Sequence, residues 1–192
     1  MSTSQPIRNR DELASLKNYY LTTCPNPRNH LLIVTGINTA LRISDILSLR
    51  WQDIYDFSAG RPREHLLLTE QKTGKQTCIA VNKSLRQAFV SYLEAISLPQ
   101  PEDFVFYGKT PGTPLSRSQA FRIIKRAGSQ LQLSRQISCH SLRKTFGYHA
   151  WAAGTSPALL MVIFNHSSFS ITRRYLGIEQ DDKDKVFLNL NL

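Results

Sequence analysis

The chain has 192 residues, 41% of them hydrophobic, which is enough for one well-packed core and too little for two large domains. Its 24 lysines and arginines outnumber its 14 aspartates and glutamates and give a formal net charge of +10, which favours a polyanionic partner. The three cysteines lack CxxC spacing, so neither a disulfide framework nor a zinc site is indicated, and no run approaches the roughly 18 apolar residues of a membrane helix. We therefore expect a cytoplasmic chain with no membrane partner.

The first part of the chain predicts helices around a buried segment. Residues 1–10 are polar and are expected to be loosely held. Apolar residues recur at helical spacing over residues 11–21, and the nearly continuous apolar run over residues 30–37 predicts a helix in the core. A short helix is expected to start at Ser44, so that Arg42 falls just before it. An arginine at such a junction is more often solvated or paired with a carboxylate than functional.

The character of the sequence changes over residues 66–81, LLLTEQKTGKQTCIAV. Two β-rich runs flank a turn centred on Thr73 and Gly74, and this pattern predicts a hairpin in a small antiparallel sheet. Lys72 and Lys75 both fall at its tip. Lysines in turns are mostly solubilising, so either one gains a function only from its context.

Helical periodicity resumes over residues 84–96, and a proline-rich stretch over residues 97–118 then predicts an ordered surface crossing, held in place by the aromatic residues of Phe104-Val105-Phe106. Residues 116–133 predict a basic helix. Phe121, Ile124 and Leu131 are expected to face inward, and Arg117, Arg122, Lys125 and Arg126 outward. Such a charged face is either simply solvated or a contact surface for DNA phosphates.

The stretch from His140 to Tyr175 concentrates side chains suited to phosphate chemistry. His140 and Arg143 are three residues apart, so on a helix they share a face with their Cβ atoms roughly 5–6 Å apart. The opposite face, with Leu142, Phe146, Ala150 and Ala153, is expected to be the buried one. The apolar run after Pro157 predicts a core helix, His166 follows it, and a further helix carries Tyr175 and ends at Gly177. Each of these residues alone is more often structural than functional.

Four motifs taken together change this interpretation: TALRISDILSL, the Lys72 hairpin, HSLRKTFGYHAWAAG and NHSSFSITRRYLGI. Their order of Arg, Lys, His-x-x-Arg, His and Tyr over residues 28–178 resembles the catalytic domain of the tyrosine recombinase (phage integrase) family. Two positions where the family often has glycine hold Ala40 and Asn165 here. Asp45 occupies a position that is usually acidic in the family, where it either orients an active-site side chain or simply favours the helix start.

The resemblance implies a mainly α fold with a small three-stranded antiparallel sheet, and a reaction with DNA that needs no metal, cofactor or ATP. Tyr175 would attack a backbone phosphorus and form a 3′-phosphotyrosine, leaving a free 5′-hydroxyl. His140 is the candidate base for the tyrosine proton, and Lys72, with Lys75 as the alternative, is the candidate acid for the leaving oxygen. The charge on the phosphate oxygens would be stabilised by Arg42, Arg143 and His166.

The resemblance also sets expectations for organisation and partners. Residues 1–192 are expected to form one catalytic domain with no N-terminal core-binding domain, either excised from a longer protein or naturally short, as in the fimbrial phase-variation invertases. The partners would be double-stranded DNA, three further copies in a synaptic tetramer, and accessory DNA-bending proteins, in a nucleoid-associated setting. The apolar tail within residues 178–192 would dock on a neighbouring subunit or fold back on its own core.

Two other functions share some of these features. A type IB topoisomerase uses the same chemistry to relax supercoils without pairing sites. A DNA-binding regulator would keep the fold without the chemistry, and would be expected to lack a catalytic residue, whereas this sequence retains the full set. A site-specific recombinase is therefore the leading prediction.

Overall fold

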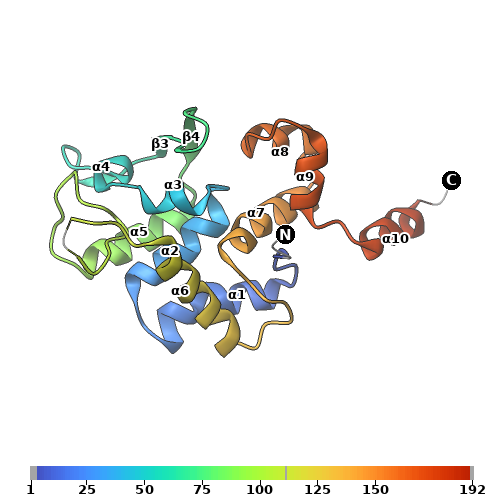
Figure 1. Cartoon of the computed structure of the whole chain (residues 1–192), viewed down its shortest axis with the longest axis horizontal. Helices are drawn as coiled ribbons and strands as arrows, with labels where there is room; N and C mark the ends of the chain where they lie inside the picture. The colour runs from blue at the N-terminus through green and yellow to red at the C-terminus, as the bar shows by residue number, and fades with distance from the viewer. Residues whose placement is uncertain (1–3, 111, 191–192) are drawn as a thin grey trace.

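The computed structural model describes residues 4–110 and 112–190, and most of these residues form helices (Figure 1). The helices are α1 (Arg10–Asn18), the π-helix η1 (Tyr19–Thr23), α2 (Pro27–Asn38), α3 (Ile43–Leu47), α4 (Trp51–Ile54), α5 (Lys83–Glu94), α6 (Arg117–Gln130), α7 (Cys139–Ala152), α8 (Pro157–Ile163), α9 (Phe169–Leu176) and α10 (Gln180–Asn189). The strands are β1 (Tyr55–Asp56), β2 (Arg61–Pro62), β3 (His65–Thr69) and β4 (Gln76–Ala80). The mainly helical class with small antiparallel sheets is confirmed. None of the described helices is both long and apolar enough to cross a membrane.

The β structure differs from the expected three-stranded sheet. Within the described residues, β1 pairs with β2 and β3 pairs with β4 in two separate two-stranded antiparallel sheets. The chain changes partner between them, because the Arg63 N–H donates to the Ile54 carbonyl while the Glu64 carbonyl accepts from Val81. The two ladders therefore follow one another along the chain instead of lying side by side. The predicted hairpin is confirmed, and its turn contains Gly74 in the left-handed region (φ 67°).

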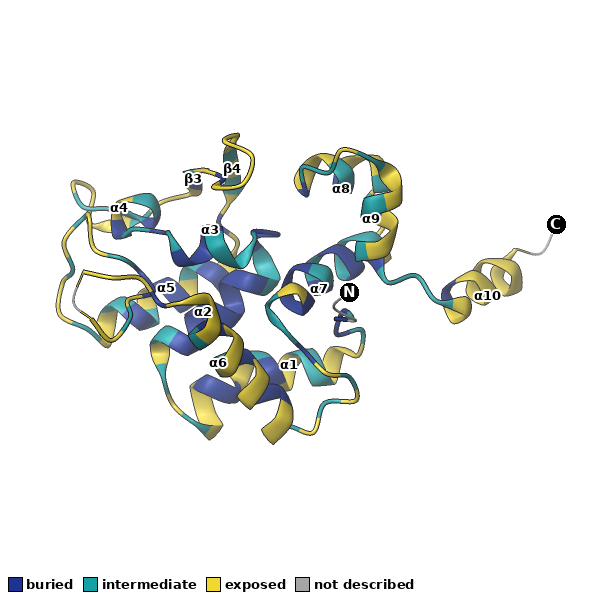
Figure 2. Cartoon of the chain, in the orientation of Figure 1, coloured by how far each residue is buried: buried dark blue, intermediate teal, exposed yellow. Residues whose placement is uncertain are grey.

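The core is centred on α2, which packs against α5 and α7 and is buried along most of its length (Figure 2). Its apolar residues join the largest hydrophobic cluster, as the sequence predicts for residues 30–37. The proline-rich crossing is anchored as predicted, because Val105 and Phe106 are fully buried in the same cluster. A smaller cluster, built on Leu160, Phe164 and Leu176, joins α8 and α9 to α7.

Three local expectations are corrected by the structure. The short helix α3 begins at Ile43, with Arg42 and not Ser44 at its N-cap. Helix α8 is not a core helix, because only one face of its two turns packs on α7 and α9; Leu160 is buried while Val162 is 70% exposed. Phe121 is 41% exposed and lies beneath Lys125 on the basic helix α6, whose inward face is filled by smaller side chains.

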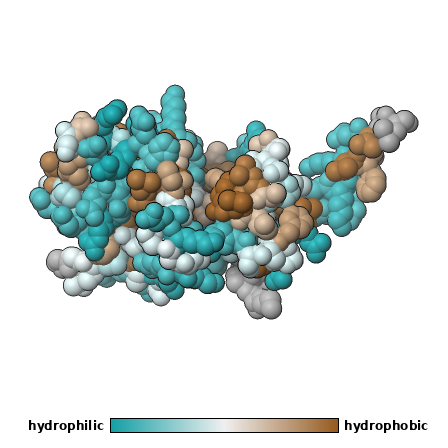
Figure 3. All heavy atoms as spheres, turned by 90° about the horizontal axis from the view of Figure 1, so that it is seen from above, coloured by the Kyte–Doolittle hydropathy of each residue, from teal (hydrophilic) through white to brown (hydrophobic). Residues whose placement is uncertain are grey.

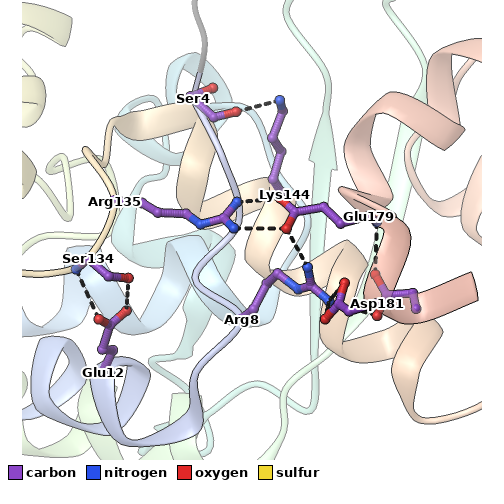
Figure 4. Close-up of polar contacts among 9 residues, drawn as sticks. Ser4, Arg8, Glu12, Ser134, Arg135, Lys144, Glu179 and Asp181 are labelled. Atoms are coloured by element: carbon purple, nitrogen blue, oxygen red, sulfur yellow. Dashed lines mark hydrogen bonds and ion pairs between the residues drawn. The ribbon is translucent and has the colours of Figure 1, made fainter. Parts of the chain in front are cut away.

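The N-terminal strap, residues 4–8, is held by α7 and by the start of α10 and is not loose as expected for residues 1–10. The Ile7 N–H donates to the Thr145 hydroxyl, and Lys144 donates to the Ser4 carbonyl. The Arg8 guanidinium contacts three carboxylates at the root of the tail, those of Glu179, Asp181 and Asp182 (Figure 4). The strap is ordered because Ser4, Ile7 and Arg8 all have partners in α7 or at the start of the tail. Residues 1–3 lie outside the described part.

Replacement of Arg8 by methionine is expected to lower the free energy of unfolding by about 2 kcal/mol. The Arg8 side chain is 14% exposed and that of Asp182 is 6% exposed, so the substitution leaves a nearly buried carboxylate with only the exposed Lys185, at 4.0 Å, as a cation. Chemical denaturation of the variant and of the exposed Arg10→Met control measures the difference. Equal losses for the two variants would show that the ion pairs of the strap do not contribute to stability.

Candidate nucleic-acid cleavage site

The six predicted site residues lie on five parts of the fold. They are Arg42 before α3, Lys72 in the β3–β4 turn, His140 and Arg143 on the first turns of α7, His166 between α8 and α9, and Tyr175 on the last turn of α9. Figure 1 shows the hairpin and the α8–α9 pair on the same side of the molecule, next to α3 and α7. The Lys75 ammonium donates to the Asn165 side chain at 2.8 Å, so the hairpin and the α8–α9 turn are in contact.

Arg143 is the most deeply placed of these residues. It is 3% exposed, whereas the sequence places it on the helix face opposite the buried one. Its Nη2 donates to the Phe164 carbonyl at 2.7 Å, and its Nε has no hydrogen-bond partner among the described residues. Burial, followed by the nearby charge of Arg42, lowers its pKa to about 10. A buried guanidinium with an unused N–H is a costly arrangement that an anionic ligand would relieve.

Tyr175 and His166 pack around the same guanidinium. The Arg143 Cζ lies 5.9 Å from the centre of the Tyr175 ring, and the His166 ring meets the Tyr175 ring edge-on at 4.7 Å. His166 also stacks on Phe164 at 5.1 Å with an interplanar angle of 19°. Its Nδ1 is 3.0 Å from the buried Thr172 hydroxyl, which fixes the orientation of the imidazole ring. Three predicted residues, Arg143, His166 and Tyr175, are therefore brought into one contact group.

A glycine on α7 makes this group possible. A Cβ atom added at Gly147 would lie 2.7 Å from the Phe164 ring, closer than atoms can pack. Phe164 supplies both the carbonyl that holds Arg143 and the ring on which His166 stacks. The close approach of α7 to Phe164 therefore requires glycine at this position.

Arg42 is held at the other side of the site by a buried carboxylate. Its Nη1 donates to Glu70 Oε2 at 2.6 Å, and the Glu70 side chain is 4% exposed. Burial acts to raise the pKa of Glu70, but hydrogen bonds from Thr73 and Arg42 outweigh it and hold this pKa below its usual value. Arg42 thus faces Glu70 as a charged pair at neutral pH, at the point where the hairpin leaves β3.

Among the described residues, no hydrogen bond, ion pair or aromatic contact joins Lys72 or His140 to the other site residues. Lys72 is exposed and makes no hydrogen bond or ion pair with the described residues, whereas Lys75 reaches Asn165, the neighbour of His166. His140 lies at the solvent edge of α7. Its pKa is lowered by partial burial and then by the charges of Arg143, Lys144 and Arg42.

Two positions where the resemblance leads us to expect glycine have left-handed backbone in this chain, with φ 56° at Ala40 and φ 53° at Asn165. Glycine adopts this conformation without strain, and asparagine tolerates it better than most residues. Asn165 also uses its side chain, which accepts from Lys75 and donates to Thr73. The departure at Asn165 therefore adds a link between the hairpin and the turn that carries His166.

Asp45 lies in the first turn of α3, where a carboxylate favours the start of the helix, and it also makes a hydrogen bond to the hairpin. It is fully buried, and its Oδ1 accepts from the backbone N–H of Gln71 at 2.9 Å. Its Oδ2 has no partner in the described part of the chain. Asp45 therefore holds the root of the hairpin turn to α3.

Glu70 and Thr172 belong to the site but were not predicted from the sequence. Glu70 is the only acidic residue in the hairpin sequence and directly follows β3, which is the available signal for a buried partner of Arg42. Thr172 is a polar residue on the inward face of α9, where a hydroxyl needs a partner. Within residues 4–110 and 112–190, no three or more His, Cys, Asp or Glu side chains gather into a group that could hold a metal ion.

We expect His166 to remain neutral throughout the neutral and mildly acidic range. Burial, followed by the charges of Arg143 and Arg42, lowers its pKa to about 4. Because the unfolded chain has the ordinary pKa of about 6.5, the unfolded state binds the proton first and stability falls as pH drops from about 6.5 towards 4. NMR titration of the imidazole signals measures this, with the His166→Gln variant identifying the resonance. A His166 signal that titrates near 6.5 would contradict the expectation.

The chain matches a known family over most of its length. Residues 9–181 match the phage integrase family. The chain is 39% identical over 181 residues to the Bacillus subtilis protein named "Probable integrase/recombinase YoeC", which covers 94% of this chain and 93% of that protein. It is 28% identical over 151 residues to the type 1 fimbriae regulatory protein FimE of Escherichia coli, and this match covers 77% of this chain and 73% of FimE. Other matched integrases and recombinases are longer, and the chain spans about half the length of three of them (46%, 52% and 51%).

The fold is similar to that of solved recombinases. A crystal structure of XerA recombinase matches with a TM-score of 0.78 at 18% identity, over 97% of this chain and 66% of that one. Further solved neighbours include integrases and recombinases in complex with DNA. The structures establish the likeness of fold, and the sequence matches establish the family, which confirms the resemblance seen in the four motifs. The chain therefore belongs to the phage integrase family, the tyrosine-type site-specific recombinases.

Proposed function

We propose that this chain cleaves and rejoins DNA at specific sites through a 3′-phosphotyrosine formed by Tyr175, without metal or ATP. The observation that carries the proposal is the buried Arg143 beside the Tyr175 ring, with an Nε–H that lacks a partner among the described residues. A DNA phosphate placed there would satisfy this donor and present its phosphorus to the tyrosine. Solved neighbours of this fold that hold DNA support the same substrate class.

In the proposed reaction the Tyr175 oxygen attacks the phosphorus, and the bond from phosphorus to the 5′-oxygen breaks. His140 accepts the tyrosine proton, for which a neutral imidazole is needed, and its lowered pKa favours that form at neutral pH. Arg42, Arg143 and the neutral His166 would donate hydrogen bonds to the non-bridging oxygens as charge builds on them. Rejoining is the reverse, with a 5′-hydroxyl attacking the phosphotyrosine.

A hairpin lysine would give its proton to the leaving 5′-oxygen. Lys72 is the residue that matches the motif and is exposed at the turn. Lys75 is the alternative, and its hydrogen bond to Asn165 places it next to the turn that carries His166. Lys72→Met and Lys75→Met are compared on a duplex in which sulfur replaces the leaving 5′-oxygen. A sulfur leaving group needs no proton from an acid, so the variant that lacks the general acid should regain its cleavage rate on this duplex, and the other variant should show no such gain.

The surface charges support DNA as the partner. Four cations on the exposed face of α6, Arg117, Arg122, Lys125 and Arg126, are free of the core, as predicted. Together with the net charge of +10 they provide sequence-independent attraction to phosphates. We place the duplex across the face that carries the hairpin, α7 and α9, with α6 contacting its backbone.

The proposal is tested without knowing the target site in advance. A pool of duplexes with a randomised centre and a nick in one strand is incubated with the protein, denatured with detergent, and searched for DNA that stays attached to protein. Recovered sequences that converge on one site, joined to the protein through a 3′-phosphate, are the expected result. A topoisomerase would also become attached to DNA, but the recovered sequences would not converge on one site. DNA that binds to the protein and never becomes covalently attached would overturn the proposal. Loss of attachment in EDTA would count against a reaction without metal.

The tail supports assembly of several copies on DNA. Helix α10 extends away from the rest of the chain, and its apolar side chains face solvent, with Phe187 78% and Leu188 76% exposed (Figures 1 and 2). Apolar side chains also gather over α8, seen from above in Figure 3, where Val162 is exposed. We infer that α10 docks on a neighbouring copy in a synaptic tetramer instead of folding back on its own core. Residues 191–192 of the predicted tail lie outside the described residues.

The Phe187→Ser/Leu188→Ser double variant is expected to bind single sites normally and to lose the DNA-dependent tetramer. Mass measurement of complexes on the recovered site separates monomers, dimers and tetramers. Leu98→Ser, which changes an equally exposed leucine elsewhere (69% exposed), is the matched control. A double variant that still forms tetramers would show that α10 is not the contact.

A further inference from the structure

We propose that Glu70 is a positioning residue for the cleavage reaction, which fixes Arg42 and joins the hairpin to the turn that carries His166. The inference rests on the proposed function, because it assigns Glu70 a role in the same phosphate site. Glu70 is 3% exposed and is the only carboxylate bonded to Arg42 among the described residues.

The carboxylate gathers donors from three separate parts of the fold. Its Oε2 accepts from Arg42 at 2.6 Å, from Thr73 in the hairpin turn at 2.9 Å and from Asn165 before His166 at 3.4 Å. Its Oε1 accepts from Thr77 on β4 at 3.4 Å. An ionised carboxylate has about four acceptor sites, so these donors use nearly all of its capacity. Removing its charge would therefore affect Arg42, the hairpin and the His166 turn together.

The geometry of the pair leaves the reactive edge of Arg42 available. Glu70 takes the Nη1 of the guanidinium, and no described residue accepts from its Nε or Nη2. That edge carries two parallel N–H groups, which match two oxygens of one phosphate. Glu70 can thus hold Arg42 in one rotamer without occupying the edge that would bind DNA.

The backbone of Glu70 closes the hairpin turn as well. Its N–H donates to the Lys75 carbonyl, and its carbonyl accepts from Gly74, both at 2.9 Å. Lys75 in turn donates to the Asn165 side chain. The segment that carries both candidate general acids is therefore fixed to the phosphate-binding arginine through one residue. This explains why a buried acidic residue is tolerated inside a site that must attract a phosphate.

The test measures single-turnover attachment to the recovered nicked site for the wild type, Glu70→Gln and the exposed Glu94→Gln control. Glu70→Gln keeps the shape of the side chain and removes its charge. We expect the attachment rate constant of Glu70→Gln at saturating DNA to fall about tenfold to a hundredfold. The half-saturating DNA concentration and the fraction of protein molecules that form an adduct should not change. A merely structural defect would lower this fraction instead. A Glu70→Gln rate equal to that of Glu94→Gln, or faster than the wild type, would overturn the proposal.

Two further variants test the route through Arg42. In an Arg42→Lys background, Glu70→Gln is expected to have less than a threefold further effect, because the guanidinium edge that Glu70 orients is already absent; full additivity would overturn the proposal. Should Glu70→Gln fail to fold, Thr73→Val takes its place. It removes one donor to the carboxylate, together with the acceptor for the Asn165 and Lys75 N–H groups, and is expected to slow attachment severalfold; an unchanged rate would overturn the proposal. If the wild type itself forms no adduct, it is the proposed function that fails, and this outcome is distinct from an active wild type with an unaffected Glu70→Gln.

Discussion

Tyr175→Phe is expected to abolish attachment to DNA, to below about one part in ten thousand of the wild-type rate, and to leave DNA binding within about twofold. The substitution removes one oxygen, and the remaining ring keeps its contacts with Phe164, His166 and the Arg143 guanidinium. The Tyr175 hydroxyl makes no hydrogen bond with the described residues, so the free energy of unfolding should change by less than about 0.5 kcal/mol. Loss of activity with intact stability would identify the hydroxyl as the nucleophile.

The measurement compares detergent-resistant adducts on the nicked duplex for the wild type, Tyr175→Phe and a control, Tyr55→Phe. Tyr55 lies on β1, away from α7 and α9, and its variant should attach at the wild-type rate. Peptide mapping of the wild-type adduct should place the nucleotide on the peptide that contains Tyr175. An adduct formed by Tyr175→Phe would assign the attack to another residue and remove the basis of the proposed chemistry.

The parts of the fold that the sequence predicted are those where a local pattern and the tertiary contacts agree. The hairpin had a clear turn signal at Gly74, and α9 ends at Gly177 in the left-handed region as its sequence indicated. The run over residues 30–37 is apolar on all sides and is buried on nearly all sides. In each case the chemistry of a few neighbouring residues was sufficient.

The errors arose where burial depends on distant segments. Helix α8 has a sequence as apolar as that of α2, but only Leu160 is buried, because no element of the described residues packs on its outer face. The strap was expected to be loose because it is polar, yet its partners are 138 residues away or more, as in the bond from Ile7 to Thr145. Periodicity within a window carries no information on such contacts.

In the candidate site, too, local motifs were predicted and contacts between distant segments were not. The motifs supplied the residue types, and three of them do come together around Arg143. The side chains that orient them were not visible in the motifs, because Glu70 and Thr172 act through contacts between elements. Spacing along a helix also suggested that Arg143 is exposed, whereas the closure of Phe164 over α7 at Gly147 buries it. A residue type can therefore be predicted where its depth and partners cannot.

Replacement of Arg143 is expected to separate activity from stability. A methionine there removes the donors to the phosphate, and two charge-assisted hydrogen bonds of about 1.5–3 kcal/mol each correspond to a loss of roughly 10²- to 10⁴-fold in the attachment rate. The lysine variant should fall in the same range, because an ammonium cannot bond the Phe164 carbonyl and two phosphate oxygens in the planar geometry of a guanidinium.

The stability of Arg143→Met should nevertheless stay within about 1 kcal/mol of the wild type, although the residue is 3% exposed. The arginine gains one hydrogen bond to Phe164, but it keeps a buried charge and an Nε–H without a partner among the described residues, and methionine removes both penalties. Its neighbour provides the contrast, since Leu142→Ala at 1% exposure should lose about 2–5 kcal/mol. Chemical denaturation of the two variants decides the matter. If Arg143→Met were as damaging as Leu142→Ala, Arg143 would be a structural residue; a stable but inactive Arg143→Met would show that its burial is kept for the phosphate.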